Sequence, residues 1–198
     1  MTGSAIPRRS AAVGETRVTL DISLTDVSGQ AIDGAVVGFT TGVTTGVSTA
    51  ATLAEQTQGT GGSYNIRLGS SAVGRVDATK AFDAETDPTI GVGDALEALR
   101  IALDINPSFG SATPQNLIAA DVNEDGRVGV GDALDILRFA LDVETDAVPH
   151  WVFVAPNADL PTDANSVVYD TGIDLASLPE GPVNLTGILL GNVEQIAV

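Results

Sequence analysis

The chain has 198 residues, 43% of them hydrophobic but only 4% aromatic, and carries a net charge of −17 from 26 acidic and 9 basic residues. This length suffices for one large or two small domains with a core of Ala, Val, Leu and Ile. The acidity disfavours nucleic acid and anionic membrane as partners. The absence of cysteine excludes disulfides, thiolate nucleophiles and cysteine-ligated metals. No apolar run reaches the roughly 18 residues of a membrane span, so we expect no membrane insertion.

The first third of the chain is predicted to be β-structure. Residues 1–15 have no periodicity and predict a flexible leader, whereas residues 17–24 alternate strictly between polar and apolar side chains. The apolar side chains of this strand should face the core: Val18, Leu20, Ile22 and Leu24. Further strands are expected at residues 35–40, 63–68 and 75–79. Four or five strands in about 65 residues favour a small antiparallel β-sandwich, and residues 41–60 are only weakly patterned.

Residues 121–132, DVNEDGRVGVGD, have the composition of a calcium loop, here called loop 2. Oxygen-bearing side chains stand at loop positions 1, 3, 5 and 12, and glycine stands at position 6, where such a loop turns sharply. Position 7 contributes its backbone carbonyl whatever its side chain. The predicted ligands of loop 2 are Asp121, Asn123, Asp125, Arg127 (through its carbonyl) and Asp132.

An earlier segment repeats this pattern. Residues 90–104 match residues 128–142 at eleven of fifteen positions, which indicates a duplicated loop–helix unit. Taking Asp94 as position 12 defines loop 1, residues 83–94, in which Pro88 replaces the glycine of position 6. Proline fixes φ near −65°, so loop 1 must turn differently. Its predicted ligands are Asp83, Glu85, Asp87, Thr89 (through its carbonyl) and Asp94, and the duplication predicts two calcium ions per chain.

A helix is expected directly after each loop. Leucine and alanine recur at helical spacing in both copies, and each closing aspartate stands at a helix N-terminus, where a carboxylate favours the macrodipole. The two expected stripes are Leu96, Leu99, Ala102 and Leu103 in the first helix, and Leu134, Leu137, Ala140 and Leu141 in the second. Thr113 followed by Pro114 predicts the N-terminus of a short helix that leads into loop 2.

Three strings of the sequence resemble known families. The pair DPTIGVGDALEALR and DVNEDGRVGVGDALDILR resembles type I dockerins, duplicated EF-hand-like calcium modules that bind cohesins through loop positions 10 and 11 and nearby helix residues. Those positions, usually hydroxyl residues, are here Val92-Gly93 and Val130-Gly131. The string LTDVSGQAIDGAVVGFT resembles immunoglobulin-like or transthyretin-like modules, and WVFV with NLTGILLGNV resembles the C-terminal end of large bacterial surface proteins and adhesins.

The resulting expectation is a mixed α and β fold, an antiparallel β-sandwich (immunoglobulin-like or transthyretin-like) with a dockerin-like pair of loop–helix units. The sequence divides into a leader (1–15), sandwich strands (16–80), a calcium module (81–145) and C-terminal strands (146–198). Apolar segments at 150–154, 166–170 and 183–191 should be strands that return to the N-terminal ones and complete a single sandwich. Trp151 and Phe153 are expected in the core.

The expected role is a calcium-stabilised, non-catalytic structural or interaction module of a secreted or cell-surface bacterial or archaeal protein. Partners would be cohesin-like proteins or adjacent domains of the same protein, and the chain itself would be a monomer. One alternative is a true dockerin that docks onto a cohesin. Another is part of a carbohydrate-active enzyme, which the single histidine, the lack of a catalytic triad and the scarcity of aromatic residues disfavour.

Overall fold

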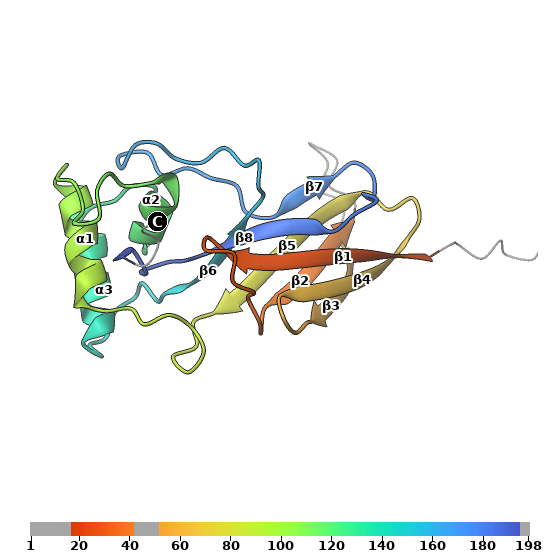
Figure 1. The fold of residues 1–198 in the computed structure, drawn as a ribbon, viewed down its shortest axis with the longest axis horizontal. Coiled ribbons are helices and arrows are strands. Elements are labelled where there is room, and N and C mark those ends of the chain that lie inside the picture. The colour runs from red at the N-terminus through yellow and green to blue at the C-terminus, as the bar shows by residue number, and fades with distance from the viewer. Residues whose placement is uncertain (1–16, 42–51, 195–198) are drawn as a thin grey trace, which may run out of the picture.

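The computed structural model describes residues 17–41 and 52–194, and it describes the side chains of these residues except 52–58. The expected leader therefore lies outside the described residues. Eleven elements follow in order: β1 (Arg17–Asp26), β2 (Val36–Thr41), β3 (Thr52–Gln58), β4 (Ser63–Gly69), β5 (Gly74–Ala81), α1 (Val92–Ala102), α2 (Pro114–Ala120), α3 (Val130–Ala140), β6 (His150–Val154), β7 (Ile173–Leu175) and β8 (Val183–Leu189). The fold is mixed α and β, with a large, mostly antiparallel sheet at one end and the three helices at the other (Figure 1).

One sheet contains strands from both the first and the last part of the described chain. Its strand order is β3-β2-β5-β6-β8-β1-β4, and β7 pairs with β5 off this path. β5 pairs with β2 over residues 74–79 and with β6 over residues 80–81, so the sheet bends along this strand and curls into a nearly barrel-shaped layer. β8 lies parallel to β1, with Ile22 opposite Val183. The predicted pairing of C-terminal with N-terminal strands is therefore confirmed.

The core side of β1 agrees with the sequence pattern except at its start. Leu20, Ile22 and Leu24 are buried, but Val18 is 39% exposed, so its predicted burial is wrong. Val18 lies opposite Leu68, next to the first pair of the β1–β4 ladder, Arg17 with Gly69. Trp151 and Phe153 are buried as predicted.

Two strand assignments need correction. β3 lies in the weakly patterned 41–60 stretch, where no strand was expected, and residues 42–51 of that stretch lie outside the described residues. Residues 166–170 form no strand, and their backbone contacts include an isolated bridge between Asp163 and Ser166 and a hydrogen bond to loop 2. β7 begins later, at Ile173. The apolar pattern of residues 166–170 reflects the burial of Val167 against the helical end.

The helices follow the predicted starts. Thr113 caps α2, accepting a hydrogen bond from Asn116 N–H at 3.3 Å, and Pro114 occupies the first position. α1 and α3 begin at equivalent residues of the repeat and pack side by side. Each ends before an aspartate with positive φ, Asp104 (57°) and Asp142 (54°), so the duplication extends to the helix C-termini. Among the described residues, no helix has the length and apolar character needed to cross a membrane.

Candidate functional site

Loop 2 is organised by two carboxylates that enter it from opposite ends. Asp121, at the C-cap of α2, accepts hydrogen bonds from Asp125 N–H and Gly126 N–H, each at 3.1 Å. Asp132, in the first turn of α3, accepts them from Gly129 N–H at 2.8 Å and Asn123 N–H at 3.3 Å. The backbone of the loop is thus wrapped around both side chains.

The glycine at position 6 has a conformational reason. Gly126 has φ +87°, in the left-handed region that other residues adopt only at a cost. This turn allows Asp121 to receive two successive N–H groups through its two oxygens. The sequence signal at this position therefore corresponds to the backbone geometry that a calcium loop needs.

The carboxylates of Asp121 and Asp132 are buried, and neither has a cationic side chain as a partner among the described residues. Asp121 is 3% exposed and Asp132 1% exposed, and within residues 17–41 and 52–194 neither forms an ion pair with Lys, Arg or His. Burial, followed by the nearby charges of Asp132 and Asp125, raises the pKa of Asp121 to about 6. Burial also raises the pKa of Asp132. This concentration of negative charge would be relieved by a cation.

The other predicted ligands of loop 2 lie nearer the surface. Asn123 Oδ1 accepts a hydrogen bond from Asp125 N–H at 2.9 Å. The Asp125 carboxylate is 3.4 Å from Arg127 Nε in an exposed ion pair. Among the described residues, no group of three or more His, Cys, Asp or Glu side chains is already placed to hold a metal by itself. Any site in loop 2 therefore also needs the Asn123 amide, the Arg127 carbonyl or an inward turn of Asp125.

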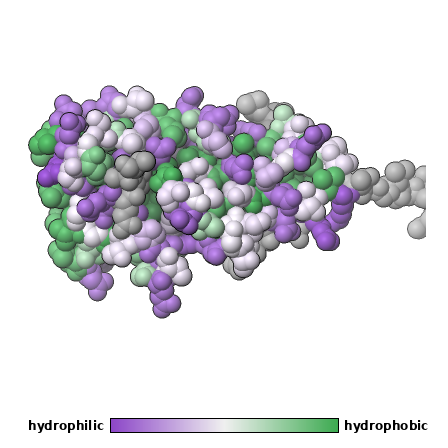
Figure 2. Space-filling model, in the orientation of Figure 1, coloured by the Kyte–Doolittle hydropathy of each residue, from purple (hydrophilic) through white to green (hydrophobic). Residues whose placement is uncertain are grey.

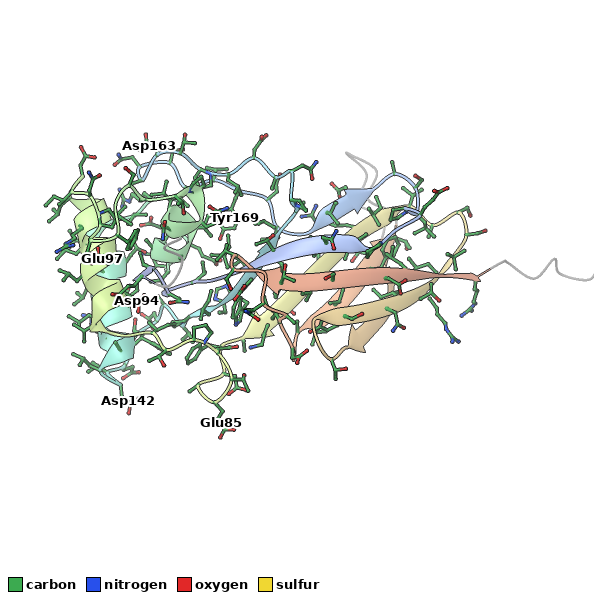
Figure 3. All side chains as sticks on the ribbon, viewed as in Figure 1. Glu85, Asp94, Glu97, Asp142, Asp163 and Tyr169 are labelled. Carbon is green, nitrogen blue, oxygen red and sulfur yellow. The ribbon has the colours of Figure 1, made fainter. Side chains whose placement is uncertain are left out.

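Loop 1 does not bring all five of its predicted ligands together. Asp87 forms a buried ion pair with Lys80, and its Oδ2 accepts hydrogen bonds from Trp151 Nε1 at 3.0 Å and Asp83 N–H at 2.8 Å. The Lys80 ammonium also lies 5.5 Å from the centre of the Trp151 ring. Glu85 points away from the molecule at the tip of the loop, far from Asp94 among the helices (Figure 3). Asp83 and Thr89 are both exposed.

Asp94 has a partner that its counterpart in loop 2 lacks. Its Oδ2 accepts a hydrogen bond from Gly91 N–H at 2.8 Å, as Asp132 does from Gly129. Its Oδ1, however, accepts one from Glu194 N–H at 2.8 Å, and Asn116 Nδ2 donates to Val193 O at 2.9 Å. Position 12 of loop 1 thus binds the segment after β8 to the helical end.

The outer side of the α1–α3 pair carries an apolar face, defined here by Val92, Leu96, Leu99, Val130, Leu134 and Leu137. Val92 and Val130 are 54% and 57% exposed, and Leu96 and Leu134 are exposed as well. Hydrophobic surface gathers at the helical end in Figure 2. Two leucines of each predicted stripe thus line this face, whereas Leu103 and Leu141 are exposed outside it. Ala98 and Ile136, at equivalent positions of the two helices, are fully buried.

The single histidine lies between loop 2 and the sheet. His150 begins β6, and its Nε2 lies 3.4 Å from the exposed Glu124 carboxylate. Its Nδ1 lies 3.1 Å from the carbonyl of Val148. These contacts connect loop 2 with the start of β6. His150 is the first residue of the strand that the sequence predicted at residues 150–154.

Comparison with family models, curated proteins and solved structures found no match to this chain. The function proposed below therefore rests on the arrangement of the loop carboxylates.

Sequence reasoning did not anticipate three partners of the loop carboxylates. Lys80 and Trp151 hold Asp87 from β5 and β6, and Glu194 holds Asp94 from beyond β8. Trp151 is separated from Asp87 by 64 residues and Glu194 from Asp94 by 100. No local pattern records such contacts, because they arise only when β6 and β8 join the sheet.

Proposed function

We propose that this chain is a calcium-stabilised, non-catalytic structural module of a secreted or cell-surface bacterial or archaeal protein, with loop 2 as its principal calcium site. The observation that carries the proposal is the buried pair Asp121 and Asp132, which approach one loop from both ends without a cationic partner among the described residues. Uncompensated buried carboxylates are costly. A calcium ion would remove that cost and use the oxygen ligands that it prefers.

Asp87 provides an internal comparison. It too is a buried loop carboxylate, but Lys80 neutralises it and Trp151 satisfies its second oxygen. Among the described residues, loop 2 therefore holds two buried carboxylates without an ion pair, Asp121 and Asp132, whereas in loop 1 Asp87 is paired and only Asp94 is buried without an ion pair. This contrast favours a calcium ion at loop 2 over a merely structural role for its carboxylates.

The duplicated sequence supports a second, weaker ion in loop 1. Asp87 would have to leave Lys80 and Trp151, and Asp94 would have to share its carboxylate with the Glu194 N–H. Both rearrangements oppose binding. The proposal is therefore two calcium ions per chain with unequal affinities, the loop 2 ion binding more tightly.

Calcium titration of the intact chain by calorimetry tests the site. Wild-type protein should show a tight event of about one ion followed by a weaker one, given one ion for each loop of this type. Asp132→Asn should remove the tight event, whereas Asp94→Asn, the equivalent change in loop 1, should leave it in place. If the tight event survives Asp132→Asn, the assignment to loop 2 is wrong.

We further infer that the helical end is a dockerin-like pair inserted into an immunoglobulin-like sandwich. The repeated helix starts and ends support the first part. The placement of all three helices between β5 and β6, two neighbouring strands of one sheet, supports the second. Calcium would then stabilise an insertion whose two ends emerge side by side from the sheet.

The apolar face favours an interaction role as well. Exposed apolar surface of this kind commonly marks a protein contact, and here it is shared by equivalent residues of both repeats. The face would bind a cohesin-like protein or an adjacent domain of the parent protein. Immobilised cohesins should retain the wild-type chain and release the Leu96→Glu/Leu134→Glu double variant. Equal retention of both, at equal folding by circular dichroism, would contradict the use of this face.

A further inference from the structure

Loop 2 is attached to a segment outside the repeat. Residues 155–172 connect β6 to β7 and contain no helix or strand, only isolated bridges. We call this segment the crossover. A connection of this length without regular structure is unusual in a compact domain and is often functional.

Two backbone hydrogen bonds join the crossover to loop 2. Val128 N–H donates to Ala164 O, and Val167 N–H donates to Gly126 O, both at 2.7 Å. Val167 is buried, which anchors the contact with an apolar side chain. A tight turn presents these groups: Ser166 N–H donates to Asp163 O at 3.0 Å, and Asn165 N–H donates to Asp163 Oδ1 at 2.9 Å.

The two groups of loop 2 that hold the crossover flank the expected carbonyl ligand. Gly126 O and Val128 N–H belong to the two peptide groups on either side of Arg127, and they meet Val167 and Ala164. Because the C=O and N–H of one trans peptide group point in opposite directions, a carbonyl of Arg127 directed at an ion would leave Val128 N–H directed away from that ion. An ion that fixes residue 127 would fix both attachment points of the crossover.

The far end of the crossover is attached to the sheet. Gly172 N–H donates to Phe153 O at 2.7 Å, and Arg75 of β5 contacts Thr171 O and the Asp174 carboxylate. β7 then pairs with β5 over Ile173–Leu175. The crossover is thus attached at two places. Its hydrogen bonds to Gly126 and Val128 attach it to the helical end, and its contacts with Phe153 and Arg75 attach it to the sheet.

We propose that calcium in loop 2 controls the order of the crossover, so that residues 155–172 form a calcium-dependent strap between the helical end and the sheet. This inference rests on the proposed calcium site. Without calcium, repulsion between Asp121 and Asp132 loosens residues 126–128, and the strap loses its attachment there while β1 and β4 keep their pairing. Among the described residues, the strap would then be the first part to become accessible to proteases.

Hydrogen–deuterium exchange of the full chain, followed by mass spectrometry, tests the inference in about 2 mM calcium, a level typical outside cells, and in chelator. Removing calcium should speed exchange at residues 163–169 by about tenfold or more, since two backbone hydrogen bonds of ordinary strength are lost. Peptides from β1 and β4 should be unchanged. Asp121→Asn removes both a calcium ligand and the repulsion with Asp132, so exchange at residues 163–169 should no longer respond to calcium. Asp146→Asn, a change at an exposed carboxylate outside both loops, should behave as wild type.

The outcomes separate the two proposals. If calorimetry shows calcium binding at loop 2 but exchange at 163–169 does not respond to calcium, the strap is refuted and the calcium site stands. If calorimetry shows no binding at loop 2, both are refuted. A calcium response spread equally over β1 and β4 would also refute the strap, because it would mean global rather than local stabilisation.

Discussion

Replacing Asp121 by asparagine should change stability in opposite directions with and without calcium. In chelator at pH 7 the charged Asp121 side chain destabilises the folded state. Its pKa, raised from 3.8 to about 6, corresponds to a loss of at most about 3 kcal/mol in the free energy of unfolding, at 1.36 kcal/mol per pKa unit. The amide removes this charge but loses one acceptor for the N–H groups of Asp125 and Gly126, a cost of about 1 kcal/mol. The variant should therefore be about 1–2 kcal/mol more stable than wild type without calcium.

In calcium the order should reverse. At a free concentration one hundred times the dissociation constant, binding to the folded state alone adds about 2.7 kcal/mol to wild type. For a chain of this size that is a rise in Tm of about 5–10 °C, which the variant should lack.

Thermal unfolding followed by circular dichroism gives the Tm of wild type and of Asp121→Asn, each in chelator and in calcium. Asp83→Asn is the matched control, because Asp83 is the exposed carboxylate at position 1 of loop 1. It should leave both the Tm in chelator and the main calcium shift near wild type. The reasoning is refuted if Asp121→Asn is less stable than wild type in both conditions, or if it keeps the wild-type calcium shift.

Three further predictions follow from the same contacts. Asp87→Ala should lower the free energy of unfolding by about 3 kcal/mol in urea titrations, because it leaves the Lys80 ammonium buried and unpaired; a loss below about 1 kcal/mol, or loss of the tight calcium event, would contradict this role. In chelator, the contribution of Asp121 to stability should decline as pH rises from about 4 to about 6, since its pKa is raised in the folded state and the folded chain then holds the proton more tightly than the unfolded chain. Calcium should remove this decline, and a Tm series across that pH range with and without calcium would show it; a contribution that grows with pH in chelator would be inconsistent with the raised pKa. Gly126→Ala should cost about 1 kcal/mol and weaken calcium binding, because φ at this residue is +87°, whereas Gly129→Ala, at an ordinary φ of −121°, should be tolerated; equal effects on Tm and affinity would refute the conformational argument.

The sequence predicted most of the local structure because the relevant signals are local. Alternation along residues 20–24, the Thr113-Pro114 helix start and the spacing of loop 2 each depend on a few adjacent residues. The return of the C-terminal strands to the N-terminal ones was also predicted, because three isolated strands bury too little surface to fold by themselves. The structure shows this return in the pairing of β8 with β1.

The arrangement of the loop 1 ligands and the exposure of the apolar stripes depended on contacts between distant parts of the chain. Loop 1 has a full set of oxygen ligands in sequence, yet Lys80 and Trp151 hold Asp87, and Glu194 holds Asp94. The helical periodicity around Leu96 and Leu134 indicated an apolar stripe but not how much of it would stay exposed. Neither outcome can be read from spacing, because each is decided by which strand or segment packs alongside.

The most direct test of the calcium site is a crystal structure of the chain grown in calcium, with the ion located by its anomalous scattering. The account predicts an ion in loop 2 at about 2.3–2.6 Å from oxygens of Asp121, Asp132 and the Arg127 carbonyl, with the crossover in contact at Gly126 and Val128. An ion bound elsewhere on the chain, or loop 2 free of any ion at millimolar calcium, would contradict it.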